Sequence, residues 1–207
     1  MSRGRFITLE GGEGVGKSTQ VKALSAILRS RGIEALVTRE PGGSDGAEKI
    51  RELLLGGAED RWGSRSEALL FAAARADHVE KVIRPALEAG KWVLSDRFVD
   101  SSLAYQGGAG GLGIETMREI NAFGLNGWYP DRTFVLIFDQ GGDRARERDS
   151  GASDRIGGRP DDYHRKVEAA FRIIAAEEPE RVQLVDASGT HEDVTKRLLD
   201  ALADLIP

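Results

Sequence analysis

The chain contains no cysteine, and this absence removes several classes of function at once. Without thiols, its 207 residues cannot form disulfide bonds, thiolate zinc sites or a cysteine nucleophile. The sequence also lacks an opening basic segment followed by an apolar one, and no apolar run approaches the roughly 18 residues of a membrane span. We therefore expect no membrane segment and a cytoplasmic location.

An excess of positive charge is also absent, because 34 acidic residues outnumber 29 basic ones and give a net charge of −5. A protein that coats nucleic acid needs the opposite balance, so we expect no nucleic-acid partner. The three histidines, at positions 78, 164 and 191, show no ligand or triad spacing, and we interpret them as structural. The length fits one larger domain, so residues 1–207 are expected to form a single unit.

A glycine-rich segment near the start of the chain carries the strongest functional signal. Residues 11–18 read Gly-Gly-Glu-Gly-Val-Gly-Lys-Ser, which fits the phosphate-binding loop pattern of a Gly, four free positions and Gly-Lys-Ser/Thr. The apolar run 6–9 before it predicts a buried strand, and apolar residues at helical spacing predict a helix over 20–31. This context favours a nucleotide-phosphate site over a chance glycine-rich turn.

The residue types of this loop suit phosphate binding. Gly11, Gly14 and Gly16 allow positive φ and carry no Cβ, so backbone N–H groups can wrap a phosphate chain. Lys17 adds a point charge for the β- and γ-phosphates, and the Ser18 hydroxyl is placed to ligate Mg²⁺.

The rest of the chain alternates between apolar runs and amphipathic stretches, which predicts an α/β fold. An arginine-rich segment at about 141–160 is either a solvated loop or a mobile lid that brings arginine onto phosphates. Further strands are expected at 33–38, 92–98, 133–139 and 182–185, and helices at 45–55, 64–88 with a kink or break at Pro85, 114–125, 161–178 and 191–205.

Charged residues stand where two of these strands end. In an open parallel sheet, ligands gather beyond the carboxyl ends of the strands, so Arg39, Asp96 and Arg97 should converge on the edge that carries the phosphate loop. Asp96 suits the water shell of Mg²⁺, and the two arginines suit bidentate phosphate contacts.

Five motifs then appear together along the chain. They are Leu9-Glu10-Gly11 through Thr19, Thr38-Arg39-Glu40-Pro41-Gly42-Gly43, Leu70-Phe71-Ala72-Ala73-Ala74-Arg75, Ser95-Asp96-Arg97-Phe98 and Ser101-Ser102-Leu103-Ala104-Tyr105-Gln106-Gly107. In this combination the chain resembles the bacterial thymidylate kinase family over nearly its whole length. The resemblance implies a P-loop NTPase-type three-layer fold, with a five-stranded parallel sheet flanked by helices and an arginine-rich lid. It also implies a homodimer that transfers the γ-phosphoryl group of ATP to dTMP with Mg²⁺ as cofactor, giving dTDP and ADP.

The resemblance implies roles for individual residues of the acceptor site. Phe71 would stack on the thymine, and Arg75 would hydrogen-bond its O4 side. Ser102 and Gln106 would contact the base region, and Tyr105 would crowd the sugar C2′ so that ribonucleotides fit badly.

The same resemblance implies the phosphate contacts. Arg39, Arg51 and Arg97 would hold the acceptor phosphate, and Glu13 would approach the sugar 3′-OH. ATP would bind to Gly11, Gly12, Glu13, Gly14, Val15, Gly16, Lys17, Ser18 and Thr19. The catalytic candidates are Lys17, Arg97, Asp96, Glu13, Arg148 and Arg155, with Ser18 and Asp96 at the metal.

The lid carries the last expectation. Some members of the family have an arginine in the phosphate loop at the position of Gly14, so this chain resembles the branch whose lid supplies that arginine. Arg148 and Arg155 are the candidates. After Ile156 the branch often has an acidic residue, whereas this chain has glycines at 157–158.

Three other classes remain as alternatives. A regulatory GTPase would carry an Asn-Lys-x-Asp motif after a later strand, and none is present. A partition-type ATPase would have an extra Lys early in the loop, where Glu10 and Gly11 stand. A deoxynucleoside kinase shares the acid-arginine pair after a strand, but it would phosphorylate a neutral hydroxyl and need a base, whereas three arginines here await an anion.

Overall fold

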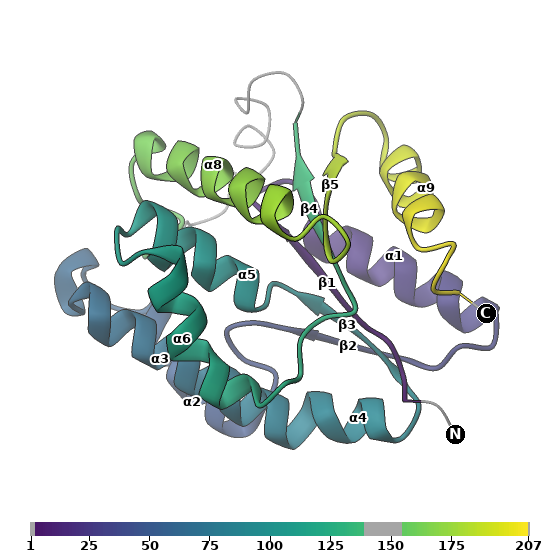
Figure 1. The fold of residues 1–207 in the computed structure, drawn as a ribbon, viewed down its shortest axis with the longest axis horizontal. Helices are drawn as coiled ribbons and strands as arrows, with labels where there is room; N and C mark the ends of the chain where they lie inside the picture. The colour runs from purple at the N-terminus through teal and green to yellow at the C-terminus, as the bar shows by residue number, and fades with distance from the viewer. Residues whose placement is uncertain (1–2, 139–154, 207) are drawn as a thin grey trace.

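The computed structural model describes residues 3–138 and 155–206. They form three layers, in which one parallel sheet lies between two layers of helices (Figure 1). The strand order is β2-β3-β1-β4-β5, and all four neighbouring pairs are parallel. This confirms the expected five-stranded α/β fold. The strands are β1 (Phe6–Gly11), β2 (Ala35–Arg39), β3 (Trp92–Asp96), β4 (Arg132–Ile137) and β5 (Val182–Asp186).

Helices cover both faces of the sheet (Figure 1). Helices α1 and α9 pack on one face, and most of the others pack on the opposite face. The longer helices are α1 (Lys17–Ser30), α2 (Asp45–Leu55), α3 (Ser64–His78), α6 (Ile114–Leu125), α8 (Asp161–Glu177) and α9 (His191–Ala201). Shorter helical segments are Glu59–Arg61, Val79–Ile83, α4 (Arg84–Glu88), α5 (Val99–Ser102) and the π-helical Leu103–Ala109.

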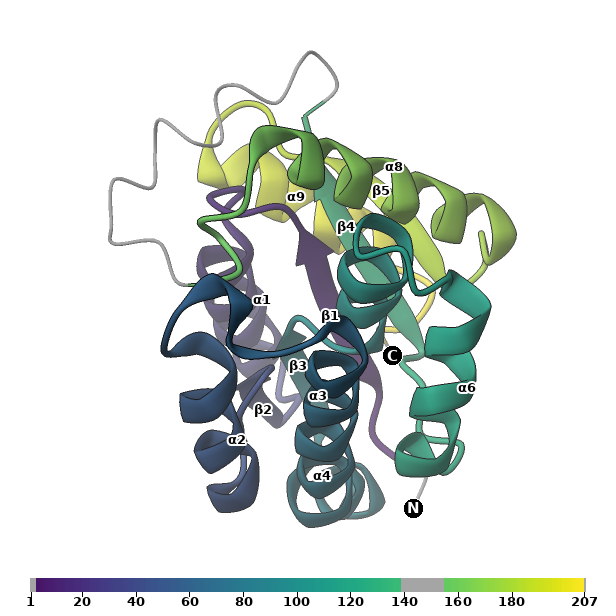
Figure 2. The same cartoon turned by 90° about the vertical axis from the view of Figure 1, so that its left-hand side faces the viewer.

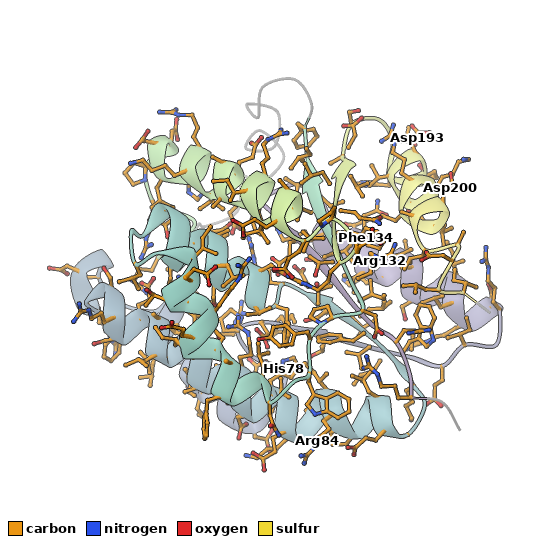
Figure 3. The ribbon with its side chains drawn as sticks, viewed as in Figure 1. His78, Arg84, Arg132, Phe134, Asp193 and Asp200 are labelled. Carbon is orange, nitrogen blue, oxygen red and sulfur yellow. The ribbon has the colours of Figure 1, made fainter. Side chains whose placement is uncertain are left out.

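The alternation of side chains along each strand creates the two cores. On β4, Phe134 packs in the cluster beneath α1 and α9, whereas Val135 packs among residues of α6 and α8 on the other face. Figure 3 shows Phe134 at the centre of the molecule and Asp193 and Asp200 on the outer side of α9. A period of two therefore lets one strand serve both layers.

The expected helix over 64–88 is interrupted near the predicted position. Helix α3 ends at His78, a π-helical turn follows over Val79–Ile83, and α4 begins with Pro85 in its first turn. Proline is tolerated there because the first turn of a helix needs no backbone N–H donor. The prediction of a kink or break at Pro85 is confirmed.

Helices α2, α3 and α6 stand side by side on the face opposite α1 (Figure 2). Helix α3 and helix α6 approach closely, because a Cβ built on Gly124 would lie 2.8 Å from the Cβ of Ala76. Within the described residues, no helix combines the length and the apolar character needed to cross a membrane.

Candidate active site

The phosphate loop connects β1 to α1 at the carboxyl edge of the sheet. Gly11, Gly14 and Gly16 have φ values of 128°, 67° and 93°, which favour glycine over residues with a Cβ. A Cβ on Gly11 would also lie 2.4 Å from the carbonyl oxygen of Leu136 on the neighbouring strand. Helix α1 begins at Lys17, directly after the loop, so its unpaired N–H groups face the same space.

The ammonium group of Lys17 lies inside the loop. It donates to the carbonyl oxygens of Gly11 at 3.3 Å and Gly12 at 2.5 Å. Burial lowers the pKa of Lys17 to about 8, and repulsion from Arg97 acts in the same direction. A phosphate that entered the loop would supply the negative charge that this buried ammonium group needs.

A buried carboxylate lies beneath the loop. Glu10 accepts hydrogen bonds from the backbone N–H of Phe98 at 2.7 Å, from the N–H of Ser101 at 3.2 Å and from the Ser101 hydroxyl at 2.6 Å. Burial raises the pKa of Glu10 to about 7, and the charge of Asp100 adds to this shift. The sequence interpretation gave Glu10 no role, although an acidic residue within a buried strand was a signal of one.

These bonds hold the turn that carries Arg97. The backbone of Arg97 has a φ of 68°, which is unusual for a residue with a side chain. Its guanidinium group donates to the Gly11 carbonyl oxygen at 3.0 Å and to Glu13 at 2.7 Å, and it lies 5.0 Å from the ring centroid of Tyr105. Burial alone would raise the pKa of Glu13, but Arg97 and Lys17 outweigh burial and lower it.

Two cavities meet at this point. The larger one, of about 420 Å³, is lined by the phosphate loop and by the turn between β5 and α9. The smaller one, of about 220 Å³, extends between α2, α3 and the segment after β3. Four residues line both cavities, namely Glu13, Ser18, Asp96 and Arg97. At this boundary the hydroxyl of Ser18 donates to the carboxylate of Asp96.

The smaller cavity contains every residue that the resemblance assigned to the acceptor nucleotide. They are Arg39, Arg51, Phe71, Arg75, Arg97, Ser102, Tyr105 and Gln106. The larger cavity is lined by residues 13–19 of the phosphate loop, whereas Gly11 and Gly12 contribute the carbonyl groups that bind Lys17.

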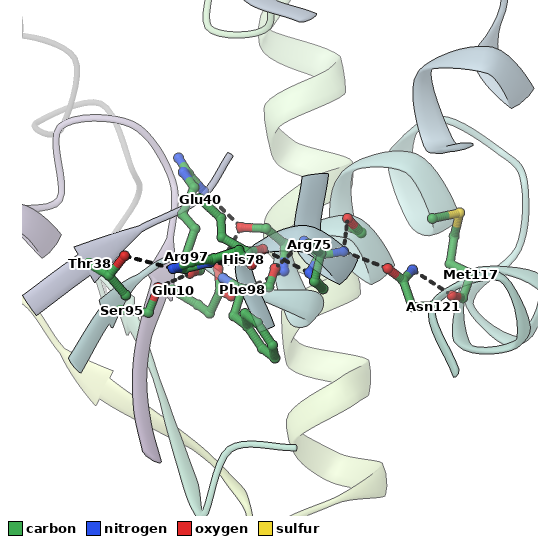
Figure 4. A network of polar contacts seen from close by, with 12 residues as sticks. Glu10, Thr38, Glu40, Arg75, His78, Ser95, Arg97, Phe98, Met117 and Asn121 are labelled. Atoms are coloured by element: carbon green, nitrogen blue, oxygen red, sulfur yellow. Dashed lines mark hydrogen bonds and ion pairs between the residues drawn. The ribbon is translucent and has the colours of Figure 1, made fainter. Parts of the chain in front are cut away.

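Arg75 is the most constrained of these side chains (Figure 4). Its guanidinium group is 2% exposed and donates to Glu40 at 2.8 Å, to Ser102 at 3.0 Å, to Asn121 at 2.6 Å and to the Phe98 carbonyl oxygen at 3.0 Å. An arginine has five N–H groups. These four bonds therefore leave one N–H group, on Nη2, for the cavity.

Glu40 is held in turn by His78 (Figure 4). The Nδ1 atom of His78 lies 3.0 Å from Glu40, and its Nε2 atom lies 2.7 Å from the hydroxyl of Thr38. Gly43 packs directly against this contact, because a Cβ on Gly43 would lie only 2.3 Å from the Nε2 atom of His78. The expected structural role of His78 agrees with this position.

Arg155 does not lie where the sequence interpretation expected it. It lines neither cavity, and its side chain is 1% exposed. Its guanidinium group donates to Glu67 at 2.6 Å and to the Leu54 carbonyl oxygen at 2.8 Å. The buried carboxylate of Glu67 is therefore one partner of this arginine. Arg148 lies outside the described residues.

The sequence interpretation missed one side of the larger cavity. Ala187, Gly189, Thr190 and His191 line it and follow the end of β5. Thr190 caps α9 by accepting from the backbone N–H of Asp193 at 3.2 Å, which fixes this turn. The rule that ligands gather at the carboxyl ends of strands applied here as well and would have found it. His191, which we interpreted as structural, is part of this wall.

Known proteins resemble the chain over its whole length. The sequence model of the thymidylate kinase family matches residues 9–198. A thymidylate kinase of Rhizorhabdus wittichii is 60% identical over 207 residues and is covered to 99%, as is this chain. One of Bradyrhizobium diazoefficiens is 47% identical over 209 residues, covering 99% of this chain and 92% of that relative. The crystal structure of thymidylate kinase from Ehrlichia chaffeensis superimposes with a TM-score of 0.75 at 29% identity, covering 97% of this chain and 99% of that one.

The raised pKa of Glu10 predicts a pH dependence of stability. In the unfolded chain, the carboxyl group of Glu10 loses its proton with the ordinary pKa of 4.5, but in the folded chain it does so with a pKa of about 7. Glu10 therefore stabilises the fold fully below pH 4.5, and this contribution disappears as the pH rises through about 7. The loss should be on the order of 3 kcal/mol at most.

Glu10→Gln tests this dependence, because the amide keeps the shape of the carboxylate but does not titrate. Urea unfolding of the nucleotide-free protein at pH 5 and pH 8 should show that the parent loses more free energy of unfolding than the variant. Parallel losses in the two proteins would contradict the prediction.

Proposed function

Because the chain belongs to the thymidylate kinase family, which phosphorylates dTMP to dTDP, we propose that its larger cavity binds ATP and its smaller cavity binds dTMP. The observation that carries the proposal is the shared boundary of the two cavities at Glu13, Ser18, Asp96 and Arg97. Two nucleotides that point their phosphates at this boundary would face each other. Transfer then requires no covalent enzyme intermediate, because the acceptor phosphate is itself an anionic nucleophile.

The donor phosphates would lie in the phosphate loop. Lys17 would exchange its bonds to loop carbonyl oxygens for the β- and γ-phosphates, while the N–H groups at the start of α1 add further donors. Arg97 would contact the transferred group, because its guanidinium group reaches both cavities. Positioning and stabilisation of charge are the main contributions that phosphoryl transfer asks of a protein.

Mg²⁺ fits the boundary of the cavities. Among the described residues, no group of three or more His, Asp or Glu side chains could hold a metal ion by itself. Ser18 and Asp96 supply a hydroxyl and a carboxylate oxygen that already lie against each other, and Mg²⁺ commonly combines one or two such ligands with substrate phosphates and water. When bound, the ion would neutralise charge on the β- and γ-phosphates.

The acceptor cavity suits a pyrimidine nucleotide. Arg39, Arg51 and Arg97 line the cavity and would provide positive charge for its phosphate, and Glu13 would approach the sugar 3′-OH. The half-buried ring of Phe71 offers a stacking surface for thymine. The base would meet Arg75, Ser102 and Gln106, with Tyr105 against the sugar.

The α3 and α6 surface supports the proposed homodimer. Leu69 on α3 and Phe123 on α6 are 59% and 95% exposed, although both are large apolar side chains. The two helices pack closely at Gly124 and Ala76, so they present a continuous surface. We propose that a second copy of the chain covers it.

Two broader predictions accompany this function. An enzyme that acts on ATP and dTMP needs both nucleotides free in solution, which supports a cytoplasmic location. Apolar clusters on both faces of one sheet support a single kinase domain over residues 1–207, with the arginine-rich lid at about 141–160.

The first test is release of ADP from ATP with dTMP, dUMP, dCMP, dAMP and thymidine as separate acceptors. We expect the highest kcat/KM with dTMP and no turnover with thymidine, which lacks the anion that the arginines would bind. Lys17→Ala tests the proposed ATP site, because it removes one positive charge from the phosphate loop. It should keep the circular dichroism spectrum but lose at least about 100-fold in turnover. Turnover of thymidine, or a fully active Lys17→Ala variant, would contradict the proposal.

The second test separates two arginines of the expected lid. Arg155→Ala should lower the free energy of unfolding by roughly 1–3 kcal/mol, because it removes a buried donor from Glu67. Arg148→Ala should leave stability unchanged and lower turnover by roughly 100-fold or more, as expected for an arginine on the transferred phosphoryl group. The assignment fails if both variants match the parent in urea unfolding and in turnover.

The third test concerns the homodimer. Phe123→Glu should shift the protein from dimer to monomer in sedimentation velocity, because a charge on this surface must be desolvated in the interface. Ile173→Glu is the control, since Ile173 is 50% exposed on α8, outside the proposed interface. Equal sedimentation of both variants and the parent would contradict this interface.

A further inference from the structure

Another buried glutamate, Glu67, lies behind the smaller cavity. Glu67 stands in the first turn of α3, and its side chain is 4% exposed. Its Oε2 atom accepts hydrogen bonds from Arg155 at 2.6 Å and Arg159 at 2.8 Å. Its Oε1 atom accepts from the Nε2 atom of Gln106 at 3.0 Å. Glu67 therefore joins a cavity residue to the start of the segment that leads into α8.

This contact fixes the orientation of the Gln106 side chain. A carboxamide has a donor end and an acceptor end of nearly the same shape, whereas a carboxylate paired with guanidinium groups only accepts. The amino group of Gln106 must therefore face Glu67. Among the described residues, the Oε1 atom of Gln106 accepts no hydrogen bond, and Gln106 lines the smaller cavity. The acceptor end is thus the end available to a ligand.

The remaining bonds of the cluster hold Glu67 in place. Arg155 is anchored at the end of α2 by its bond to the Leu54 carbonyl oxygen at 2.8 Å. Arg159 lies over the ring of Tyr163, 4.6 Å from its centroid. The hydroxyl of Tyr163 donates to the carbonyl oxygen of Tyr105 at 2.8 Å, which fixes the backbone next to Gln106.

The acceptor end of Gln106 complements one donor of Arg75 in the same cavity. Thymine presents an N–H group at ring position 3 beside a carbonyl oxygen at position 4. Cytosine presents the reverse, a bare ring nitrogen beside an amino group. A site with one fixed donor and one fixed acceptor would match thymine at both atoms and oppose cytosine at both.

We propose that Glu67 is a positioning residue that sets the selectivity of the site for thymine over cytosine by holding the carboxamide of Gln106 with its oxygen toward the base. The proposal rests on the base contacts given under the proposed function. Arg155 and Arg159 donate to Oε2 of Glu67 and compensate its charge, whereas Oε1 is the atom that holds Gln106.

The test compares kcat/KM for dTMP and dCMP at saturating ATP. In Glu67→Gln the new amide can donate to the oxygen of Gln106 and turn its amino group toward the cavity. The ratio of kcat/KM for dTMP to that for dCMP should fall at least about tenfold, mainly through a higher KM for dTMP, while the KM for ATP stays unchanged. The ratio cancels any loss in phosphoryl transfer that both nucleotides share.

Arg159→Met is the matched control, because it removes one guanidinium group from Glu67 but keeps the bond between Glu67 and Gln106. It should lower the melting temperature and keep the ratio within about threefold of the parent. If Glu67→Gln fails to fold because Arg155 loses the carboxylate that compensates its charge, the double variant Glu67→Gln with Arg155→Met removes that charge and should show the same loss of selectivity.

Three outcomes would overturn the inference. A folded Glu67→Gln variant, single or double, that keeps the parent ratio would exclude positioning by Glu67. If Arg159→Met lowers the ratio of kcat/KM for dTMP to that for dCMP as much as Glu67→Gln does, the cluster supports the structure but does not position Gln106. Gln106→Ala identifies the remaining case. If that variant keeps the parent ratio, the proposed base contact of Gln106 is wrong, and the inference falls with it while dTMP phosphorylation itself still stands.

Discussion

The parallel pairing of β1 with β3 is the interaction on which the whole site depends. Leu9 lies opposite Asp96, and its carbonyl oxygen accepts from the N–H of Arg97 at 2.9 Å. The phosphate loop leaves β1 two residues later, so it starts beside the turn that carries Arg97. A positive φ at a residue with a side chain costs roughly 1–3 kcal/mol and persists only when surrounding bonds impose it. Here the side chain of Glu10 accepts a hydrogen bond from the backbone N–H of Phe98, the residue after Arg97, and so helps to hold this turn. The meeting point of the two cavities is therefore a property of the sheet.

The sequence allowed prediction of the features that depend on local pattern and topology. Strands and helices follow from periodicity, and Arg39, Asp96 and Arg97 were placed correctly at one edge because parallel strands share a direction. The partners of the buried glutamates could not be predicted. Glu10 binds a residue 88 positions away and Glu67 one that is 39 positions away. No spacing reveals which distant groups the fold brings to a carboxylate, so the burial of an arginine from the expected lid was missed as well.

The ion pairs of the buried glutamates fix the geometry of the site more than they add to the free energy of unfolding. Taking two charges out of water costs about as much as their attraction returns, so a pair such as Glu40 and Arg75 adds little net free energy of unfolding. Such a pair does fix geometry, because the alternatives leave a buried charge unpaired at a cost of several kcal/mol. With four of its N–H groups engaged, Arg75 can offer a ligand only one direction of donation. Buried charge thus converts a flexible side chain into a rigid donor at the wall of the smaller cavity.

Arg39, which we propose to bind the acceptor phosphate, is held more loosely than Arg75, and this difference has a physical basis. Arg39 pairs with Glu48 at 3.1 Å, but both side chains are largely exposed, at 56% and 39%. A pair of this kind is worth about 0–1 kcal/mol, whereas a bidentate contact with a phosphate dianion is stronger. An incoming phosphate can therefore displace the carboxylate. Glu13 pairs with Arg97 in the absence of a phosphate, and its negative charge offsets part of the repulsion between Arg97 and Lys17. Under the proposed function, the deeply buried Arg75 would read the base because its partners cannot leave, whereas the exposed Arg39 would bind the anion because its partner can.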